Sequence, residues 1–245
     1  MQTPLKIIEL SKNYDGKDAV KNISFNVNQN EIIGILGPNG CGKTTTIGMI
    51  LGLLKPSKGK VLLNGVEIEN QRVNLLGSLN FISPYVELPK KLTVRQNLEV
   101  YGRLYDVKNL KTKIEYLSEK LRLSEIIHKI TGELSSGQKN RVSLAKSIIN
   151  DPKVLLLDEP TASLDPETGD YVRSFLESYQ KEKKTSILLA SHNMAEVERL
   201  CSSVIMMNKG SIIDQGKPEE LIKKHERKNM EEVFLKITRE KYEFK

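Results

Sequence analysis

Tryptophan is absent from this sequence of 245 residues, and the aromatic residues together make up only 5% of it. It also has no arginine-rich tract, so nucleic-acid binding is not indicated, although a net charge of +7 would allow an anionic partner. No apolar run approaches the roughly 20 residues of a membrane-spanning helix. Lys6 and Glu9 argue against a signal peptide, and two cysteines, Cys41 and Cys201, cannot form a disulfide framework. We therefore expect a cytoplasmic protein, and any membrane-spanning part should be a separate chain.

A glycine-rich stretch from Gly37 to Thr45 matches the phosphate-binding pattern G-x-x-x-x-G-K-[ST] without a mismatch. The apolar residues 31–36 precede it and predict a strand buried on both faces. Apolar residues at helical spacing follow it and predict a helix from about Lys43 to about Leu54. This strand–loop–helix order is the context in which the pattern binds a nucleotide.

The chemistry of such a loop follows from its backbone. Glycines let several N–H groups point at one anion, and the N-terminus of the new helix adds partial positive charge. In this arrangement Lys43 neutralises the terminal phosphates and Thr44 ligates Mg²⁺. The predicted nucleotide-binding residues of the loop are Gly37, Pro38, Asn39, Gly40, Cys41, Gly42, Lys43, Thr44 and Thr45.

Cys41 allows two interpretations. Inward-pointing N–H groups could lower its pKa, and thiol alkylation would then block nucleotide binding. The alternative, which we favour, is that Cys41 is only a small filler of the loop.

Alternating and apolar segments outline the rest of the chain. Residues 5–10 and 23–27 predict short strands, and the apolar residues 154–157, 187–190 and 204–207 predict buried ones. Buried strands that alternate with helices indicate a parallel sheet with covered faces. Residues 92–123 are rich in helix formers, and residues 89–123 carry about five net positive charges, which suit either a solvated helical face or a docking face.

Two adjacent acids close the strand at residues 154–157. A carboxylate at a strand end beside a phosphate loop holds Mg²⁺, which is the predicted role of Asp158. Glu159 is then placed to polarise the attacking water as general base. The alternative, two surface acids in a turn, fits poorly with four apolar residues that run straight into them.

Residues 134–138, Leu-Ser-Ser-Gly-Gln, precede a predicted helix. Serine and glycine at a helix start either cap the helix or expose N–H groups to an anion, and the residues alone leave both possibilities open.

Taken together, these motifs resemble those of ATP-binding cassette ATPases. Residues 134–138 are similar to the LSGGQ signature, with Ser136 in place of a glycine, and end twenty residues before Asp158. The resemblance covers about residues 4–218. It implies that Tyr14 stacks on adenine, that Asp165 with Ser163 and Leu164 forms the D-loop, and that His192 contacts the γ-phosphate. It adds Ser135, Ser136, Gly137 and Gln138 to the nucleotide-binding residues.

The resemblance also implies the fold, which is α/β. We expect a P-loop NTPase (RecA-like) parallel-sheet core with an N-terminal antiparallel β subdomain and an inserted α-helical subdomain. All 245 residues then form one nucleotide-binding domain. Its expected parts are a core at 1–83 and 152–220, a helical subdomain at 84–151 that carries the signature, and a C-terminal helical extension at 221–245.

One departure from the family concerns its glutamine at the entry into the helical subdomain, which contacts Mg²⁺ and water. Here the matching stretch is Phe81-Ile82-Ser83-Pro84-Tyr85, so Ser83 or Pro84 stands at the expected place. Either Ser83 reaches the metal through a water, which makes it a candidate metal residue, or this contact is absent.

By resemblance, catalysis falls to Glu159, His192 and Lys43, with ATP and Mg²⁺ bound between two copies. The second copy is this chain or a paralogous ATPase. Residues 92–98 and 101–105 look most like the branch that exports drugs, polysaccharides, lipids or ions, with a separate transmembrane permease and a position on the cytoplasmic face of the membrane. The alternatives are a soluble cassette ATPase acting on ribosomes or DNA, and an ATP-gated clamp with little turnover. A GTPase is disfavoured because residues 208–211 lack the acid of the N-K-x-D motif.

Overall fold

The computed structural model describes residues 3–69, 75, 77–83, 86–162 and 164–239. The chain divides into two compact units, Met1–Leu76 with Ser186–Lys245, and Gly77–Thr185. Each unit has its own set of buried apolar side chains. The domain boundaries expected from the sequence, at residues 83, 151 and 220, stay predictions.

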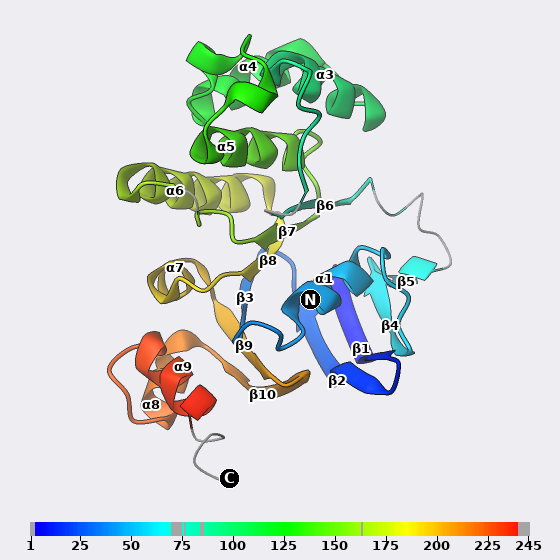
Figure 1. Cartoon of the computed structure of the whole chain (residues 1–245), viewed down its shortest axis with the longest axis vertical. Coiled ribbons are helices and arrows are strands. Elements are labelled where there is room, and N and C mark those ends of the chain that lie inside the picture. Colours follow the sequence, from blue (N-terminus) through cyan, green and yellow to red (C-terminus); the bar gives the residue numbers. More distant parts are fainter. Residues whose placement is uncertain (1–2, 70–74, 76, 84–85, 163, 240–245) are drawn as a thin grey trace. The chain divides into compact units, whose positions relative to one another are not determined.

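The first unit contains strands of two sheets (Figure 1). The antiparallel sheet has the order β2-β1-β4-β5, and its strands are β1 Leu5–Tyr14, β2 Lys17–Val27, β4 Lys58–Leu63 and β5 Val66–Glu67. In the other sheet β3 pairs in parallel with β8 and β9, while β10 is antiparallel to β9. These strands are β3 Ile32–Leu36, β8 Ser186–Ala190, β9 Ser203–Asn208 and β10 Ser211–Gly216. The predicted buried strands of this unit are therefore confirmed, and β10 is an addition.

The helices of the first unit are α1 Lys43–Ile50, α7 Met194–Leu200, α8 Pro218–Lys224 and α9 Met230–Arg239. The prediction that the helix after the loop extends to Leu54 was wrong. Gly52 adopts a φ of 64°, and the N–H groups of Leu53 and Leu54 both bond the carbonyl of Gly48. A left-handed residue with such backward bonds ends a helix.

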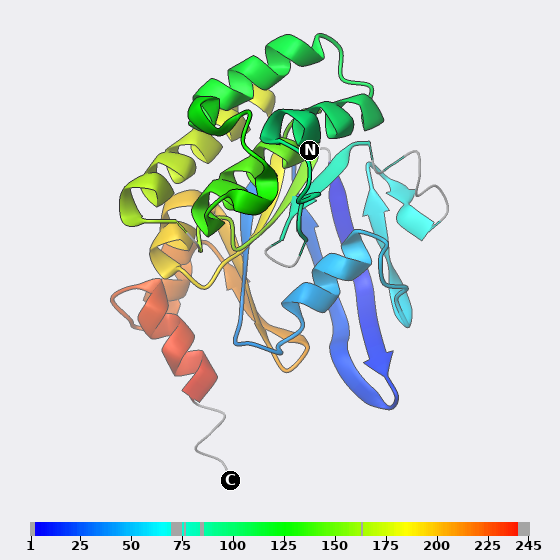
Figure 2. The ribbon, with the colours of Figure 1, turned by 45° about the horizontal axis from the view of Figure 1, so that its top comes forward.

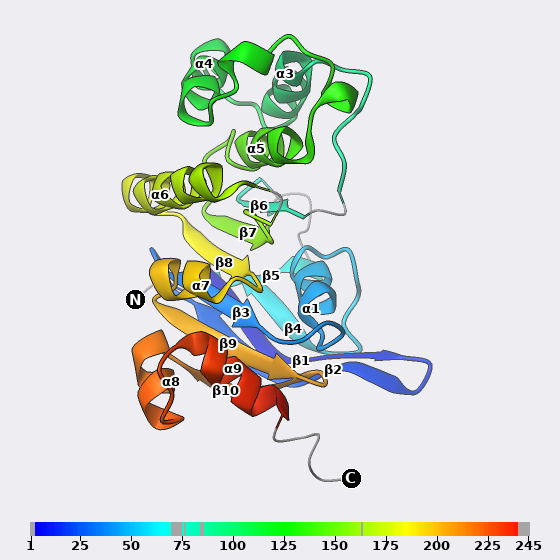
Figure 3. The ribbon, with the colours of Figure 1, turned by 60° about the vertical axis from the view of Figure 1, so that its left-hand side comes forward.

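Close packing brings α7 against β3. A Cβ atom on Gly34 would lie 3.0 Å from Cys201 Sγ and 3.3 Å from a methyl group of Val197, so only glycine permits this approach without displacement. In the same unit α9 follows α8 and packs against it (Figure 3). The backbone N–H of Met230 donates to Glu198 Oε1 at 2.6 Å. The C-terminal helices are thereby joined to α7.

The second unit combines two parallel strands with helices. The strands are β6 Leu79–Ile82 and β7 Val154–Asp158. The helices are α3 Val94–Leu104, α4 Leu110–Lys120, α5 Ser136–Ser147 and α6 Pro166–Lys183, with short 3₁₀ turns at Ser124–Ile126 and Thr131–Glu133. Helix α3 packs against both α4 and α5, which are among the green helices of Figure 2.

Local signals explain where these helices begin. Thr93 starts α3 and Ser135 starts α5, each through a capping box with a glutamine three residues later. Between α3 and α4 the chain turns through Asp106 and Asn109, both with positive φ. In the part of the chain that the structure describes, no helix has both the length and the apolar character needed to cross a membrane.

Candidate functional site

The phosphate loop leads from β3 into α1 and depends on its glycines. Gly40 and Gly42 have φ values of 76° and 110°, which side chains other than glycine rarely adopt. A Cβ atom on Gly37 would lie 2.4 Å from both Cys41 Sγ and the backbone oxygen of Met207. The sequence pattern therefore reflects steric demands of the loop itself.

Lys43 already points its ammonium group into this loop. Its Nζ donates to the carbonyl oxygens of Gly37 at 2.6 Å and Pro38 at 3.4 Å. Thr44 is exposed at the start of α1, and the buried Thr46 bonds the carbonyl of Gly42 at 2.9 Å. A cation and the free N–H groups of a helix start thus meet at one place, as the binding of a polyphosphate requires.

Cys41 is only 2% exposed and belongs to the framework of the loop. Burial raises the pKa of its thiol, and this effect outweighs the lowering by nearby Lys43. Its carbonyl accepts a hydrogen bond from the Gly210 N–H at 3.0 Å, which ties the loop to the β9–β10 turn. The possibility of a lowered pKa was therefore wrong, and the geometry supports the interpretation of Cys41 as a filler.

Two further predicted residues belong to the same unit. Tyr14 ends β1 with 44% of its surface exposed, and the ammonium of Lys12 lies 5.1 Å from its ring centroid. The ring is thus partly exposed, with the ammonium of Lys12 over one of its faces. His192 is exposed directly after β8, at the loop that leads into α7.

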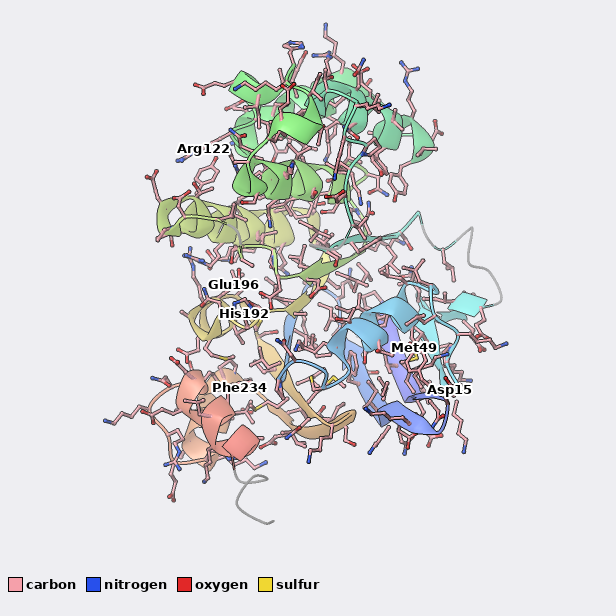
Figure 4. All side chains as sticks on the ribbon, viewed as in Figure 1. Asp15, Met49, Arg122, His192, Glu196 and Phe234 are labelled. Atoms are coloured by element: carbon pink, nitrogen blue, oxygen red, sulfur yellow. The ribbon has the colours of Figure 1, made fainter. Side chains whose placement is uncertain are left out.

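A buried carboxylate fixes the backbone around His192, and sequence reasoning missed it. Glu196 is 1% exposed and accepts a hydrogen bond from Ser191 Oγ at 2.6 Å. Ser191 Oγ in turn accepts from the Asn193 N–H at 3.1 Å, and Asn193 Oδ1 accepts from the Glu196 N–H at 3.2 Å. Figure 4 labels His192 and Glu196 in this segment. The signal in the sequence was the Asn193-x-x-Glu196 spacing of a capped helix.

In the second unit the acidic pair stands at the end of β7. Asp158 is 8% exposed, and Glu159 takes a φ of 54°. Positive φ at a residue other than glycine is often found where side-chain placement serves function. Ser83 Oγ donates to Asp158 Oδ2 at 3.1 Å, so the structure brings these two predicted metal residues together. Pro84 lies outside the described residues.

The donor set suits Mg²⁺. Each unit contains an oxygen donor of the kind that Mg²⁺ prefers, the Thr44 hydroxyl in the first and the Asp158 carboxylate in the second. The described residues contain no group of three or more His, Cys, Asp or Glu that would form an all-protein metal cage. Mg²⁺ is commonly held by one or two protein oxygens together with substrate phosphates and waters. The residues present therefore fit a metal that arrives with its nucleotide.

The signature residues form the start of α5. Ser135 Oγ accepts from the Gln138 N–H at 3.3 Å, and Gln138 Oε1 accepts from the Ser135 N–H at 3.0 Å. Leu134 is buried, whereas Ser135 and Ser136 are exposed and Gly137 is half-buried. The capping interpretation is thus correct for Ser135 and Gln138, and it leaves Ser136 at a helix N-terminus open to solvent.

Asp165 caps α6 by accepting from the Thr168 N–H at 3.0 Å. Hydrogen bonds from the Thr168 backbone and side chain hold its pKa below the ordinary value. Ser163, the other polar residue of the expected D-loop, lies outside the described residues.

A pocket of about 170 Å³ joins several of these positions within the second unit. Ser83, Asp158 and Ser136 all line it, so Asp158 and the signature helix share one cavity. The other side chains around it are Ile82, Val86, Glu87, Leu88, Lys90, Thr131, Lys139, Asn140 and Ser143.

The chain is similar to proteins of one known family. The family described as "ABC transporter" matches residues 20–162. The chain is 34% identical over 220 residues to the ABC transporter ATP-binding protein NatA of Bacillus subtilis, and this covers 89% of each chain. It is 40% identical over 215 residues to the Nod factor export ATP-binding protein I of Rhizobium johnstonii, covering 87% of this chain and 69% of that one. Among solved structures, cbiO1 from Clostridium perfringens, part of the ABC transporter complex cbiONQ, is 33% identical with a TM-score of 0.79, covering 91% of this chain and 92% of that one.

Proposed function

The chain belongs to the family of ABC transporter ATP-binding proteins, and from this premise we propose that it energises an exporter through a separate transmembrane partner. Family membership confirms the predicted α/β P-loop NTPase fold and the function of an ATPase subunit of a transporter. The proposal of export, rather than import, is supported by the 40% identity with a protein named for Nod factor export. The peripheral position on the cytoplasmic face of the membrane is part of the same proposal.

Two copies of the cassette complete the proposed site. One chain supplies one phosphate loop and one signature, so each can form half of two sites. We place the phosphates of ATP between Lys43 and Thr44 of one copy and Ser136 and Gly137 of the other. The exposed start of α5 supports this role, because its N–H groups gain an anionic partner only while the γ-phosphate is present. Loss of that phosphate then loosens the dimer, which a membrane partner can use as a movement.

Within each site we propose one role for each of these residues. Asp158 and Thr44 would hold Mg²⁺, which neutralises charge on the phosphates when bound. Glu159, held at the strand end in an unusual backbone conformation, would orient and deprotonate the attacking water. His192 would contact the γ-phosphate from a loop whose shape Glu196 fixes through Ser191 and Asn193.

The test is Glu159→Gln, which keeps the side-chain shape and removes the base. We expect ATP affinity to stay within about twofold, because the phosphate loop is intact. Turnover should fall at least about a hundredfold, the lower range for loss of a general base. Size-exclusion chromatography with ATP and Mg²⁺ should then show a stable dimer, whereas wild type returns to monomer as ATP is consumed.

A matched control is Glu177→Gln on α6, an acid outside the site. It should hydrolyse ATP like wild type. Persistent monomer for Glu159→Gln under saturating ATP would refute the two-copy site. Export is tested separately by affinity purification from membranes, where recovery of the chain without any multi-span protein would refute the proposed partner.

A further inference from the structure

Lys146 is a buried cation that the site described so far does not use. It lies in the last turn of α5, ten residues after Ser136, and is only 7% exposed. Burial lowers the pKa of its ammonium group. Among the residues that the structure describes, no carboxylate forms an ion pair with it. A lysine that is buried in this way costs folding free energy, because its charged form loses hydration without a counter-charge.

Aromatic rings and one carbonyl group surround this ammonium. Its Nζ lies 5.1 Å from the ring centroid of Phe81 and 5.2 Å from that of Tyr101, within the range of cation–π attraction. It also donates to the backbone oxygen of Phe81 at 3.4 Å. Lys146 therefore joins three elements, because it lies on α5, Phe81 on β6 and Tyr101 on α3.

Lys146 contacts strand β6, and this strand leads directly to Ser83. Asn80, one residue before Phe81, accepts from the Tyr105 hydroxyl at 3.1 Å and donates to Asn150 Oδ1 at 2.9 Å. Asn80, three residues before Ser83, is thus held by residues just beyond the C-termini of α3 and α5, and Phe81, two residues before Ser83, is held by α5 itself. A second, narrow cavity is lined by Ser83, Phe81, Tyr101 and Lys146.

Ser83 makes the contact that matters for the metal residue. Its hydroxyl donates to Asp158 Oδ2 at 3.1 Å, across 75 positions of the sequence. A hydroxyl on a single carbon has little reach, so its position is set by the backbone that carries it. Groups that bond a metal-binding carboxylate fix its orientation, and their loss typically weakens metal binding or activity by 10- to 100-fold.

We propose that Lys146 is a positioning residue of the ATPase site, which holds the end of β6 so that Ser83 can orient Asp158. The signature helix and the metal-binding carboxylate are then connected within one unit, through Lys146, the Phe81 carbonyl and Ser83. The inference rests on the proposed role of Asp158 toward Mg²⁺. In this proposal Ser83 and Lys146 together take over the role of the glutamine that the family usually has at this position.

The experiment compares Lys146→Met with wild type in the purified full chain, using MgCl₂ titrations of ATP hydrolysis. Methionine fills a similar volume without charge or donor. We expect the Mg²⁺ concentration for half-maximal hydrolysis to rise about three- to tenfold, less than for direct loss of a bond to the carboxylate. ATP binding in EDTA should stay within about twofold. The Tm should not fall, because the substitution removes a buried charge that has no counter-charge among the described residues.

Two further variants make the result specific. Lys146→Arg keeps a cation that can donate to the carbonyl and stack on the rings, and it should restore the Mg²⁺ requirement to within about twofold of wild type. Ser83→Ala should itself raise the requirement, and adding Lys146→Met to it should change little, since both act on the same contact. Lys111→Met, at an exposed position of α4, is the matched control.

Contrary results are equally clear. A lower Tm for Lys146→Met with an unchanged Mg²⁺ requirement would mean that Lys146 only stabilises the fold. Failure of Lys146→Arg to restore the requirement, or additive effects of Lys146→Met and Ser83→Ala, would also overturn the inference. Asp158→Asn separates it from the proposed function, because full hydrolysis by that variant would refute the assignment of Asp158, whatever Lys146 does.

Discussion

Gly37→Ala is the substitution in the phosphate loop for which the structure predicts the clearest loss of ATP affinity. The added Cβ would lie 2.4 Å from the Met207 carbonyl oxygen and 2.4 Å from Cys41 Sγ, whereas ordinary contacts begin at 3.4 Å. The loop must therefore move by about 1 Å, and overpacking of this kind costs about 1–3 kcal/mol. Hydrogen bonds from the loop to phosphate oxygens tolerate only a few tenths of an ångström. We expect ATP affinity to fall at least about tenfold, which corresponds to about 1.4 kcal/mol.

Titration with a fluorescent ATP analogue, combined with thermal unfolding, measures both effects. Gly77→Ala is the control, because a Cβ there would meet nothing within 4 Å. It should bind ATP like wild type. Adding Cys41→Ala to Gly37→Ala removes one of the two overlaps but leaves the backbone oxygen of Met207, so most of the defect should remain. Wild-type affinity in Gly37→Ala would show that the loop can shift freely, and the steric reasoning would then be wrong.

Three other outcomes follow from single residues. Lys43→Ala removes the ammonium from the loop, so ATP affinity should fall at least about tenfold, and an unchanged Kd would contradict its phosphate role. Because burial raises the pKa of the Cys41 thiol, iodoacetamide should label it far more slowly at pH 7.5 in the native protein than in urea, and equal rates would contradict its burial. Burial raises the pKa of Asp214, but hydrogen bonds from Lys224 and His225 outweigh this and lower it on balance. The resulting stability is present above the unfolded pKa, about 3.9, and is lost as pH falls through the lower folded pKa. Asp214→Asn should therefore flatten the acid limb of a Tm-against-pH curve, and an identical limb would refute it.

The sequence predicted those strands whose burial on both faces requires a run of apolar residues. The apolar residues 154–157, 187–190 and 204–207 became β7, β8 and β9 because strands covered on both faces admit few polar side chains. Strand β10 was missed for the converse reason. Its residues Ser211–Gly216 are mostly half-exposed and pair on the outer side of β9, so neither an apolar run nor a clean alternation marks them.

The residues of the candidate site also divide into those that the sequence predicted and those that it missed. The phosphate loop and the acidic pair are local, and their chemistry depends on neighbours in the sequence, so a motif could identify them. The pKa of Cys41 could not be predicted, because it depends on burial rather than on the loop N–H groups alone. Glu196 was missed because its carboxylate acts on Ser191, at the opposite end of a loop whose shape only the structure shows.

The departure at Ser83 shows most clearly why spacing alone is insufficient. A glutamine reaches its target through a long side chain, so its backbone can lie at some distance. Serine has no such reach, and its 3.1 Å bond to Asp158 requires the backbone itself to be close. The sequence identified the missing glutamine but gave no reason to connect it with Lys146. In the structure this lysine is buried between two rings, with its ammonium on the Phe81 carbonyl. A shorter side chain at Ser83 thus demands a firmer backbone. Lys146, which has no carboxylate partner among the described residues, is the cation that we propose to provide it.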